Sequence, residues 1–378
     1  MATLMQWTLP LNPPNPYPFY LQYLTPLRQD RLYYTKYILD IVGELTVSTN
    51  VANVREWVIP PVLFAGASPG IATGITDGPK DRIWVALQSA HRLVELDPKT
   101  GLFTAFGGVQ YPIRYPRHLM FDAAGNLWYT GSGTNGALIG RLSRNRRFAV
   151  YWDLPLELLT PEGLWVEGTG QEVWFTPINS NLGLTGAFLA RLVPATNQLT
   201  YWSYPAPGRR PVNAGVMGDR PAKPTNIWFT YDAGGSSSRV FRLHLPSGTF
   251  FEYPPQFSAP RKIVVDDSRN AWISDWSGKV SMVPRDADCG RIKLTAHRIV
   301  IEPVKLGVKS REQLAKPAVH SVTPTLQQVT PVKFDCYVDF PLPYPLMSNG
   351  IQIDVAQRGQ PNAYFTQGSG IVIGRLTP

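Results

Sequence analysis

The sequence predicts an all-β protein, a seven-bladed β-propeller of four-stranded antiparallel blades. The first observation is a four-residue signature of one apolar, one aromatic, one aromatic or aliphatic and one small residue. Such residues favour pleated, buried strands. The second observation is a regular pitch, because five successive intervals between the aromatic positions are 51, 44, 46, 54 and 44 residues, near the roughly 40–50 residues of a propeller blade. The seven copies begin at Leu32, Ile83, Leu127, Val173, Ile227, Ala271 and Ala363.

A second signature, an aromatic residue followed three positions later by proline, occurs between copies of the first. Proline cannot donate a hydrogen bond to a β-ladder, so it ends a strand or lies at an edge. We therefore expect these segments to form the fourth and outermost strand of a blade. The pairs are Trp7 and Pro10, Trp57 and Pro60, Trp152 and Pro155, Trp202 and Pro205, and Phe251 and Pro254.

The two chain ends are expected to close the ring. The proline signature at Trp7 precedes every copy of the first signature, and residues 371–376 resemble a third strand with no fourth strand after them. We predict that residues 1–10 supply the missing strand of the C-terminal blade, a closure that leaves only short, protected strand edges. The chain is then a single propeller domain over residues 1–378. The predicted blades cover about 16–60, 69–108, 111–155, 158–205, 209–255, 258–341 and 348–378.

An irregular segment, residues 285–333, lies within blade six. The aromatic positions on either side of it, Trp272 and Tyr364, are 92 residues apart. We expect an insertion between the third and fourth strands of blade six, with alternating strands at 291–295 and 297–301. A capping-box pattern at Ser310 predicts a short helix that ends at Pro317. The alternative is a degenerate eighth blade.

The two cysteines, Cys289 and Cys336, flank this segment. They either form a disulfide or remain two buried thiols, and the sequence does not decide between these states. A bridge would stabilise the fold by roughly 4 kcal/mol in the chain-entropy description of loop closure. In a chain without a visible export signal, such a bridge would be typical of a hyperthermophile or of an extracellular particle.

Charge and hydropathy restrict the partners. The formal net charge is +9, and residues 285–333 contribute +5 of it, from nine basic and four acidic side chains. This charge permits an acidic partner, but no stripe of basic and aromatic residues indicates nucleic-acid binding, which we rank lowest. No apolar run is long enough for a membrane span, and no signal peptide is visible. We expect an intracellular or particle-associated protein.

Three stretches carry a family resemblance. They are Leu-Trp-Tyr-Thr at 127–130 and two Ile-Gly-Arg-Leu strands, at 139–142 and 373–376. With a proline before each inner strand and a Gly/Asp/Asn hairpin, they resemble the streptogramin (virginiamycin B) lyase family of seven-bladed propellers. The likeness covers nearly all of the chain except about 285–333.

The resemblance implies a site of Glu and His at the mouth of the central channel, where these side chains supply metal ligands and a general base. In the family, Glu typically follows the small residue of the signature, and His opens the inner strand. Here only His118 fits, and no Glu follows a small residue. We therefore predict no catalytic residue, no metal and no cofactor, and we name as pore-mouth binding candidates Lys36, His118, Tyr231, Asp275 and Gln367.

Two functions from different classes follow. The first is a non-enzymatic platform that binds other proteins through the propeller faces or the 285–333 segment, for instance as a component of a surface or virus particle. The second is a lyase-type enzyme with a divergent site, such as His118 with Asp275 or Lys36. An acid–base mechanism needs a positioned partner for His118, and the sequence does not identify one.

Overall fold

A computed structural model describes most of the 378 residues of the chain. The statements below concern this described part, and a few side chains inside its strands are also left out of the description. The residues outside it are 11–20, 26–29, 37–38, 48–50, 65–70, 108–112, 134–135, 159, 178–186, 204–214, 233–237, 254–258, 276, 293, 295, 334–335, 337, 343–350, 355–361, 368–371 and 378.

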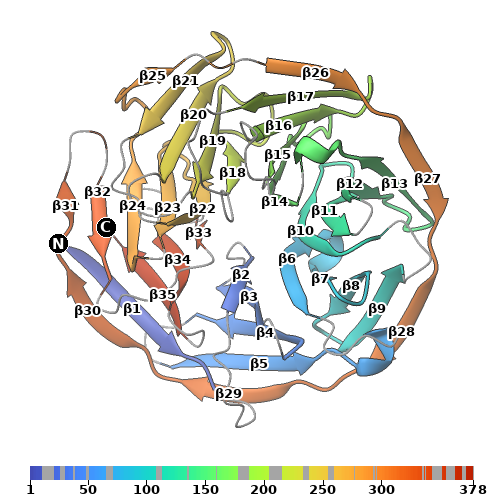
Figure 1. The fold of residues 1–378 in the computed structure, drawn as a ribbon. Helices are drawn as coiled ribbons and strands as arrows, with labels where there is room; N and C mark the ends of the chain where they lie inside the picture. The colour runs from blue at the N-terminus through green and yellow to red at the C-terminus, as the bar shows by residue number, and fades with distance from the viewer. Residues whose placement is uncertain are drawn as a thin grey trace.

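The protein is a seven-bladed β-propeller, as predicted (Figure 1). In each blade the first strand lies nearest the central axis, and the next three pair outward in antiparallel order. Blades one to four are formed by β2 (Leu21–Leu24), β3 (Arg31–Lys36), β4 (Ile41–Thr46) and β5 (Ala52–Val58); β6 (Ala72–Gly78), β7 (Arg82–Leu87), β8 (Arg92–Asp97) and β9 (Leu102–Gly107); β10 (Pro116–Phe121), β11 (Leu127–Gly133), β12 (Gly136–Leu142) and β13 (Phe148–Asp153); and β14 (Pro161–Val166), β15 (Val173–Pro177), β16 (Ala187–Val193) and β17 (Gln198–Ser203).

The remaining three blades follow the same plan, and the N-terminal strand completes the last of them. Strand β1 pairs with β35 from Thr3 opposite Thr377 to Thr8 opposite Val372, which confirms the predicted closure of the ring. Helical structure in the described residues is confined to the 3-10 turns η1 (Pro61–Phe64), η2 (Pro79–Asp81) and η3 (Leu156–Leu158), and no described helix is long and apolar enough to cross a membrane. Blades five to seven are formed by β18 (Val216–Gly218), β19 (Asn226–Tyr231), β20 (Arg239–His244) and β21 (Thr249–Tyr253); β22 (Pro260–Val265), β23 (Ala271–Asp275), β24 (Lys279–Val283) and β32 (Val338–Pro341); and β33 (Ile351–Asp354), β34 (Asn362–Gln367), β35 (Val372–Thr377) and β1 (Ala2–Thr8).

Blade three shows why the aromatic signature recurs. Trp128 on the second strand stacks on Trp152 of the fourth strand, with ring centroids 5.7 Å apart. Arg141, on the strand between them, lies over Trp128 at 5.2 Å, a cation–π geometry. Gly140 leaves room for the ring of Tyr129, because a Cβ at this position would approach a carbon of that ring to 2.0 Å. The Gly-Arg-Leu strand is therefore shaped to fit the aromatic strand beside it.

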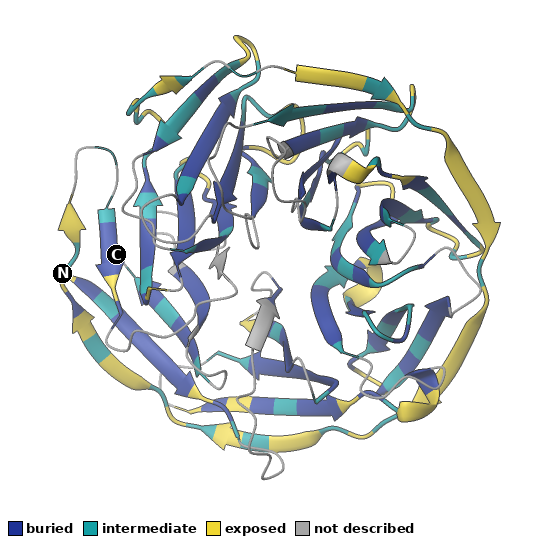
Figure 2. Cartoon of the chain, viewed as in Figure 1, coloured by how far each residue is buried: buried dark blue, intermediate teal, exposed yellow. Residues whose placement is uncertain are grey.

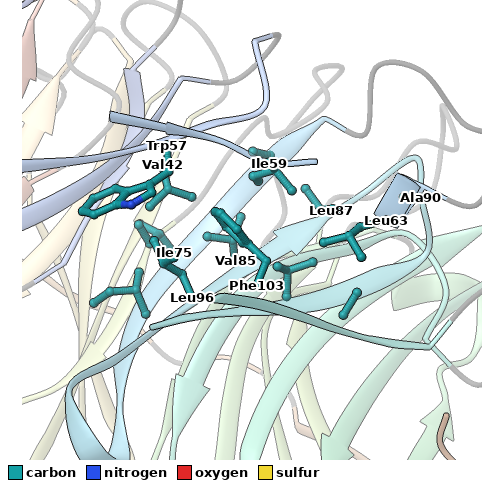
Figure 3. Packing of buried hydrophobic residues seen from close by; sticks show 14 of the residues in the cluster. Val42, Trp57, Ile59, Leu63, Ile75, Val85, Leu87, Ala90, Leu96 and Phe103 are labelled. Atoms are coloured by element: carbon teal, nitrogen blue, oxygen red, sulfur yellow. The ribbon is translucent and has the colours of Figure 1, made fainter. Parts of the chain in front are cut away.

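The hydrophobic core is divided into clusters that lie between adjacent blades. Figure 3 shows the one between blades one and two, where Trp57 and Ile59 of the first blade pack against Val85, Leu96 and Phe103 of the second. A corresponding cluster of buried residues joins every other adjacent pair of blades. Because each blade buries its faces only against its neighbours, the closed ring is the unit of stability.

The segment 285–333 is a belt around the whole ring. The chain leaves blade six after β24, runs backward past blades five, four, three, two, one and seven, and returns to blade six before β32 (Figure 1). In each blade it adds a fifth, antiparallel strand outside the fourth. The fourth strands are therefore not the outermost, contrary to prediction. The belt strands are β25 (Arg291–Ile292), β26 (Ala296–Val300), β27 (Pro303–Gly307), β28 (Ser310–Leu314), β29 (Ala318–Val322), β30 (Thr325–Val329) and β31 (Val332–Lys333).

The predicted helix after Ser310 is wrong, because this segment is strand β28. Its residues pair with β9 from Ser310 opposite Phe106 to Leu314 opposite Leu102. A capping box can begin a helix, but so short a helix is marginal unless it is packed. Here the backbone groups form a ladder with blade two instead. The alternative of a degenerate eighth blade is also excluded, since the described strands form seven sheets, and the predicted strand at 297–301 is confirmed as β26.

The belt has a seven-residue period that matches the blades. One partly or fully buried residue per period packs into the cluster between two adjacent blades. Seven extended residues span about 23 Å, which sets the distance from one interface to the next along the rim. We call these residues the belt anchors: Leu294, Ile301, Val308, Ala315, Val322 and Val329.

A disulfide between Cys289 and Cys336 closes the belt. Both cysteines lie at the cluster between blades five and six, where the belt begins and ends its circuit. The bond therefore turns the belt into a covalent hoop outside the seven blades. Of the two states that the sequence left open, the structure has the disulfide.

Candidate functional site

Bulges in the first strands direct side chains toward the centre of the ring. In blades three, four and six the pairing of the first strand with the second shifts register directly after a proline, at Pro116, Pro161 and Pro260. A β-bulge inserts one extra residue and re-aims side chains. The residues inside these three bulges are Arg117 and His118, Glu162, and Arg261 and Lys262.

The small residue of the repeated signature stabilises these bulges. In blade three the backbone N–H of His118 donates to Oγ1 of Thr130 at 3.1 Å. In blade six the backbone N–H of Lys262 donates to Oγ of Ser274 at 3.2 Å. A bulge removes a backbone donor from its ladder, and a buried donor needs a partner. The hydroxyl supplies that partner.

The bulged residues of blades three, four and six meet in one cluster, which we call the hub cluster. The Nζ atom of Lys262 lies 3.2 Å from Nδ1 of His118. The Nε2 atom of His118 lies 3.4 Å from Oε2 of Glu162. Arg117 forms an ion pair with the other oxygen of the Glu162 carboxylate, and Arg261 lies 3.3 Å from the carboxylate of Asp232.

Burial and charge set the protonation of the hub cluster. Burial, the Lys262 ammonium and Arg117 lower the pKa of His118 to about 3, against the opposing effect of Glu162. Burial alone would raise the pKa of Glu162, but Arg117, His118 and Lys262 together hold it below its ordinary value. At neutral pH His118 is therefore neutral and Glu162 ionised. A carboxylate accepts a hydrogen bond, so the proton of His118 is assigned to Nε2, and Nδ1 is the acceptor toward Lys262.

Lys262 is the third member of the hub cluster with a shifted pKa. Burial lowers its pKa to about 7, and the positive charges of Arg117 and Arg261 act in the same direction, while Glu162 opposes them. Perturbed ionisable groups that converge in one place are typical of functional sites, although structural ion-pair networks also produce them.

Of the four pore-mouth candidates whose side chains the structure describes, only His118 belongs to the hub cluster. Lys36 is buried and ion-paired with Glu56, at 2.6 Å, and donates to the carbonyl of Pro10. Asp275 is fully buried and accepts hydrogen bonds from backbone N–H groups, including that of Ser277 at 2.7 Å. The contacts described for Lys36 and Asp275 are thus with residues other than His118.

The other two candidates have different places. Tyr231 ends β19, is buried and packs edge-on against Phe241 inside blade five. Gln367 ends β34 opposite Val372, but its side chain lies outside the described residues.

The hub residues that sequence reasoning missed are Arg117, Glu162, Arg261 and Lys262. The expected acid was sought after the small residue of each signature, whereas Glu162 lies on the first strand. A usable signal was present, because each of these residues lies one or two positions after the proline that opens a first strand. Comparing those three short segments would have identified the cluster.

The hub cluster is poorly suited to a divalent cation. His118 and Glu162 could supply two metal ligands, but the cationic groups of Arg117 and Lys262 lie against them and would repel a cation. Within the described ranges no three His, Cys, Asp or Glu residues are grouped so that they could hold a metal ion.

Comparison with known proteins supports the fold. No protein family and no curated protein matches the sequence. Among solved structures, virginiamycin B lyase from Staphylococcus aureus covers the full length of both chains with a TM-score of 0.64 and 15% identity. A catalytically inactive histidine variant of that enzyme with quinupristin has a TM-score of 0.65, with 15% identity over 100% of this chain and 99% of the other. A hydrazine synthase from Kuenenia stuttgartiensis has a TM-score of 0.52 and 10% identity over 73% of this chain and 80% of the other. The chain thus shares the complete seven-bladed fold of the streptogramin lyases.

Proposed function

We propose that this protein is a non-enzymatic structural platform whose belt packs against other protein subunits of a larger assembly, such as a surface or virus particle. The observation that carries the proposal is the apolar surface of the belt. Twelve large hydrophobic side chains are exposed in the described structure, and seven of them lie on the belt: Val300, Val304, Leu306, Leu314, Val319, Leu326 and Val332. The other five, Met1, Val51, Val58, Val62 and Leu156, lie outside it.

The position of these residues favours a contact along the rim. Figure 2 shows the exposed residues following the outer circumference, while the blades inside it are largely buried. Single exposed apolar residues are ordinary on a surface, but seven of them recur on this one element, and we infer that together they mark an interaction site. Because exposed apolar side chains lie on belt strands beside several blades, other subunits could contact the rim at several positions around the ring.

The backbone of the belt supports the same proposal. Each belt strand except β31 and β25 is five residues long, and each is the last strand of its sheet. An edge strand carries unpaired N–H and C=O groups that can pair with another chain unless they are covered. The belt thus combines apolar side chains with backbone groups at a free edge.

A pair of matched substitutions tests the platform. Val319→Lys and Leu314→Lys place charges on the belt, where the side chains are 65% and 63% exposed. Leu156→Lys is the control, because its side chain is 69% exposed but lies on η3 rather than the belt. We expect the belt variants to lose assembly or partner recovery in light scattering and pull-down experiments while the control keeps it. Equal behaviour of all three variants would contradict a role for the belt.

A lyase-type enzyme remains the second candidate, because His118 and Glu162 lie together at the centre of a fold that streptogramin lyases share. It predicts turnover of a cyclic depsipeptide lactone such as quinupristin, which should disappear in His118→Ala. Lack of turnover by the folded wild-type protein would remove this candidate.

A further inference from the structure

We propose that a cavity between blades five and six binds a small phosphate monoester. The cavity has a volume of about 520 Å³ and lies at the hairpin ends of the two blades. This volume is within the range of roughly 300–1,000 Å³ that is usual for small-molecule sites, so an organic group has room there beside a phosphate. The proposal does not rest on the proposed function of the belt.

Three arginines from separate segments line this cavity. Arg242 lies on β20, Arg269 on the hairpin between β22 and β23, and Arg285 two residues after the end of β24. A guanidinium group stays charged in proteins and presents a planar fork of N–H donors that matches the oxygens of a phosphate. The convergence of three such groups on one cavity favours an anionic ligand.

The two aspartates that line the cavity are each paired with an arginine. Oδ2 of Asp286 lies 2.9 Å from Nε of Arg285, and Oδ2 of Asp288 lies 2.5 Å from a terminal nitrogen of Arg291. The other two arginines of the lining therefore leave an excess of two positive charges. A phosphate monoester carries a charge of about −1.5 to −2 at pH 7, which matches this excess.

Arg242 shapes the cavity. Its two terminal nitrogens donate to the backbone carbonyls of Arg285 and Ala287, and its guanidinium lies 4.2 Å over the ring of Phe251, a cation–π contact. Arg242 is thus a positioning residue that holds the chain at 285–287 and adds its charge. Among the described residues, none pairs with the side chain of Arg269, so its N–H donors are left for the ligand.

Blade three offers an internal comparison, because it repeats the same hairpin contact. The backbone N–H of Arg285 donates to Oδ1 of Asn270 at 3.3 Å, and that of Arg144 donates to Oδ1 of Asn126 at 3.0 Å. Arg144 is therefore the counterpart of Arg285. Of the described residues that line the corresponding cavity in blade three, Arg144 alone is charged.

The other difference between the two blades is at Arg269, whose counterpart is Gly125. Each residue donates its backbone N–H to the aspartate three positions earlier, and each has a left-handed backbone, with φ of 67° and 82°. Such a backbone favours glycine, so the turn itself does not explain an arginine. The cavity does explain it, because the Arg269 guanidinium lines that space.

Calorimetric titration of the full chain with phenyl phosphate tests the proposal, with benzoate as the carboxylate that carries the same ring. We expect phenyl phosphate to bind at one site per chain. Benzoate should bind at least about tenfold more weakly, because it lacks one charge and one oxygen for the arginine fork. An absence of saturable phenyl phosphate binding, or an equal affinity for benzoate, would overturn the proposal.

Two variants locate the binding. Arg269→Gly introduces the residue of blade three where glycine is favoured, so the thermal midpoint should be unchanged or raised. Its affinity for phenyl phosphate should fall about tenfold or more, since charged hydrogen bonds are lost. Arg144→Ala is the matched control and should bind like the wild type. Wild-type affinity in Arg269→Gly, or an equal loss in Arg144→Ala, would overturn the proposal, because binding would then lie elsewhere or follow net charge alone.

Discussion

The hub and the rim of this propeller handle polar groups in opposite ways. At the hub, ionisable side chains are held against one another away from most of the solvent: His118 and Glu162 are buried, and Lys262 is partly buried. At the rim, the belt is largely exposed and basic, and it carries exposed apolar side chains. The belt is held in place by backbone hydrogen bonds to the fourth strands and by a disulfide. The difference shows that contacts between ionisable side chains fix the structure of the hub. The structure of the rim is fixed instead by the seven-residue spacing of the belt anchors along the chain.

Removal of the disulfide should have the largest effect on stability. The double variant Cys289→Ser, Cys336→Ser opens a loop of 47 residues, and we expect a loss of about 4 kcal/mol in the free energy of unfolding because the unfolded chain gains conformational freedom. Denaturant unfolding with and without reductant measures this. Reductant should shift the wild type and not the double variant. An unchanged midpoint would show that ladders alone hold the rim.

A glycine substitution compares the blades with the belt. Gly140→Ala places a Cβ against the Tyr129 ring, and overpacking of this kind should cost about 2–3 kcal/mol. Gly307→Ala on the belt is the matched control, because no atom lies within 4 Å of its added Cβ. It should change stability by less than about 0.5 kcal/mol. Similar losses at both positions in thermal unfolding would contradict the packing described for blade three.

An anchor substitution tests the seven-residue period of the belt. Val329→Ala empties part of the cluster between blades six and seven and should cost about 2 kcal/mol, from lost burial and a small cavity. Val319→Ala, on an exposed belt position, should be close to neutral. Urea titration of the two variants gives the comparison. If both were neutral, the belt would be held without its anchors.

The pH dependence of the free energy of unfolding tests whether His118 is held neutral in the hub cluster. The pKa of His118 is lowered from 6.5 to about 3, so between these values the unfolded chain binds a proton that the folded protein does not. The free energy of unfolding therefore falls as the pH falls, by about 1.4 kcal/mol per pH unit for this group.

His118→Gln should remove that slope, as measured by urea midpoints between pH 6 and pH 5. His297→Gln, at an exposed belt position, should keep it. A slope that persists unchanged in His118→Gln would show that His118 is protonated in the folded state.

The blades could be predicted from the sequence because their signals are local and repeated. Trp128 and its counterparts occur once per blade, and prolines after Trp57 and Trp152 mark where fourth strands end. The closing strand could be predicted for the same reason, since a missing fourth strand and a surplus one were both visible. Regular strands thus follow from local chemistry.

The course of the belt could not be predicted from local preference, because its partners lie far away in the chain. Ser310 and its neighbours satisfy a helix rule, but pairing with β9 overrides it. The sequence did contain a signal, because a small or apolar residue recurs every seven positions from Leu294 to Val329. This repeat can be interpreted only once it is known that the segment passes one blade per period. The hub cluster was missed for a similar reason, since Lys262 and His118 are 144 residues apart.

The covalent hoop has a consequence for how this architecture can change over generations. Propellers commonly differ in how many modules they contain, and a module can be gained by duplicating one stretch of the gene. Here a duplicated blade would enlarge the perimeter of the ring by about 23 Å. The belt, which the disulfide between Cys289 and Cys336 closes at a fixed length, would then be too short to reach around it. A second, simultaneous insertion of seven codons would be needed elsewhere, so this lineage is expected to keep its sevenfold count while its loops diverge.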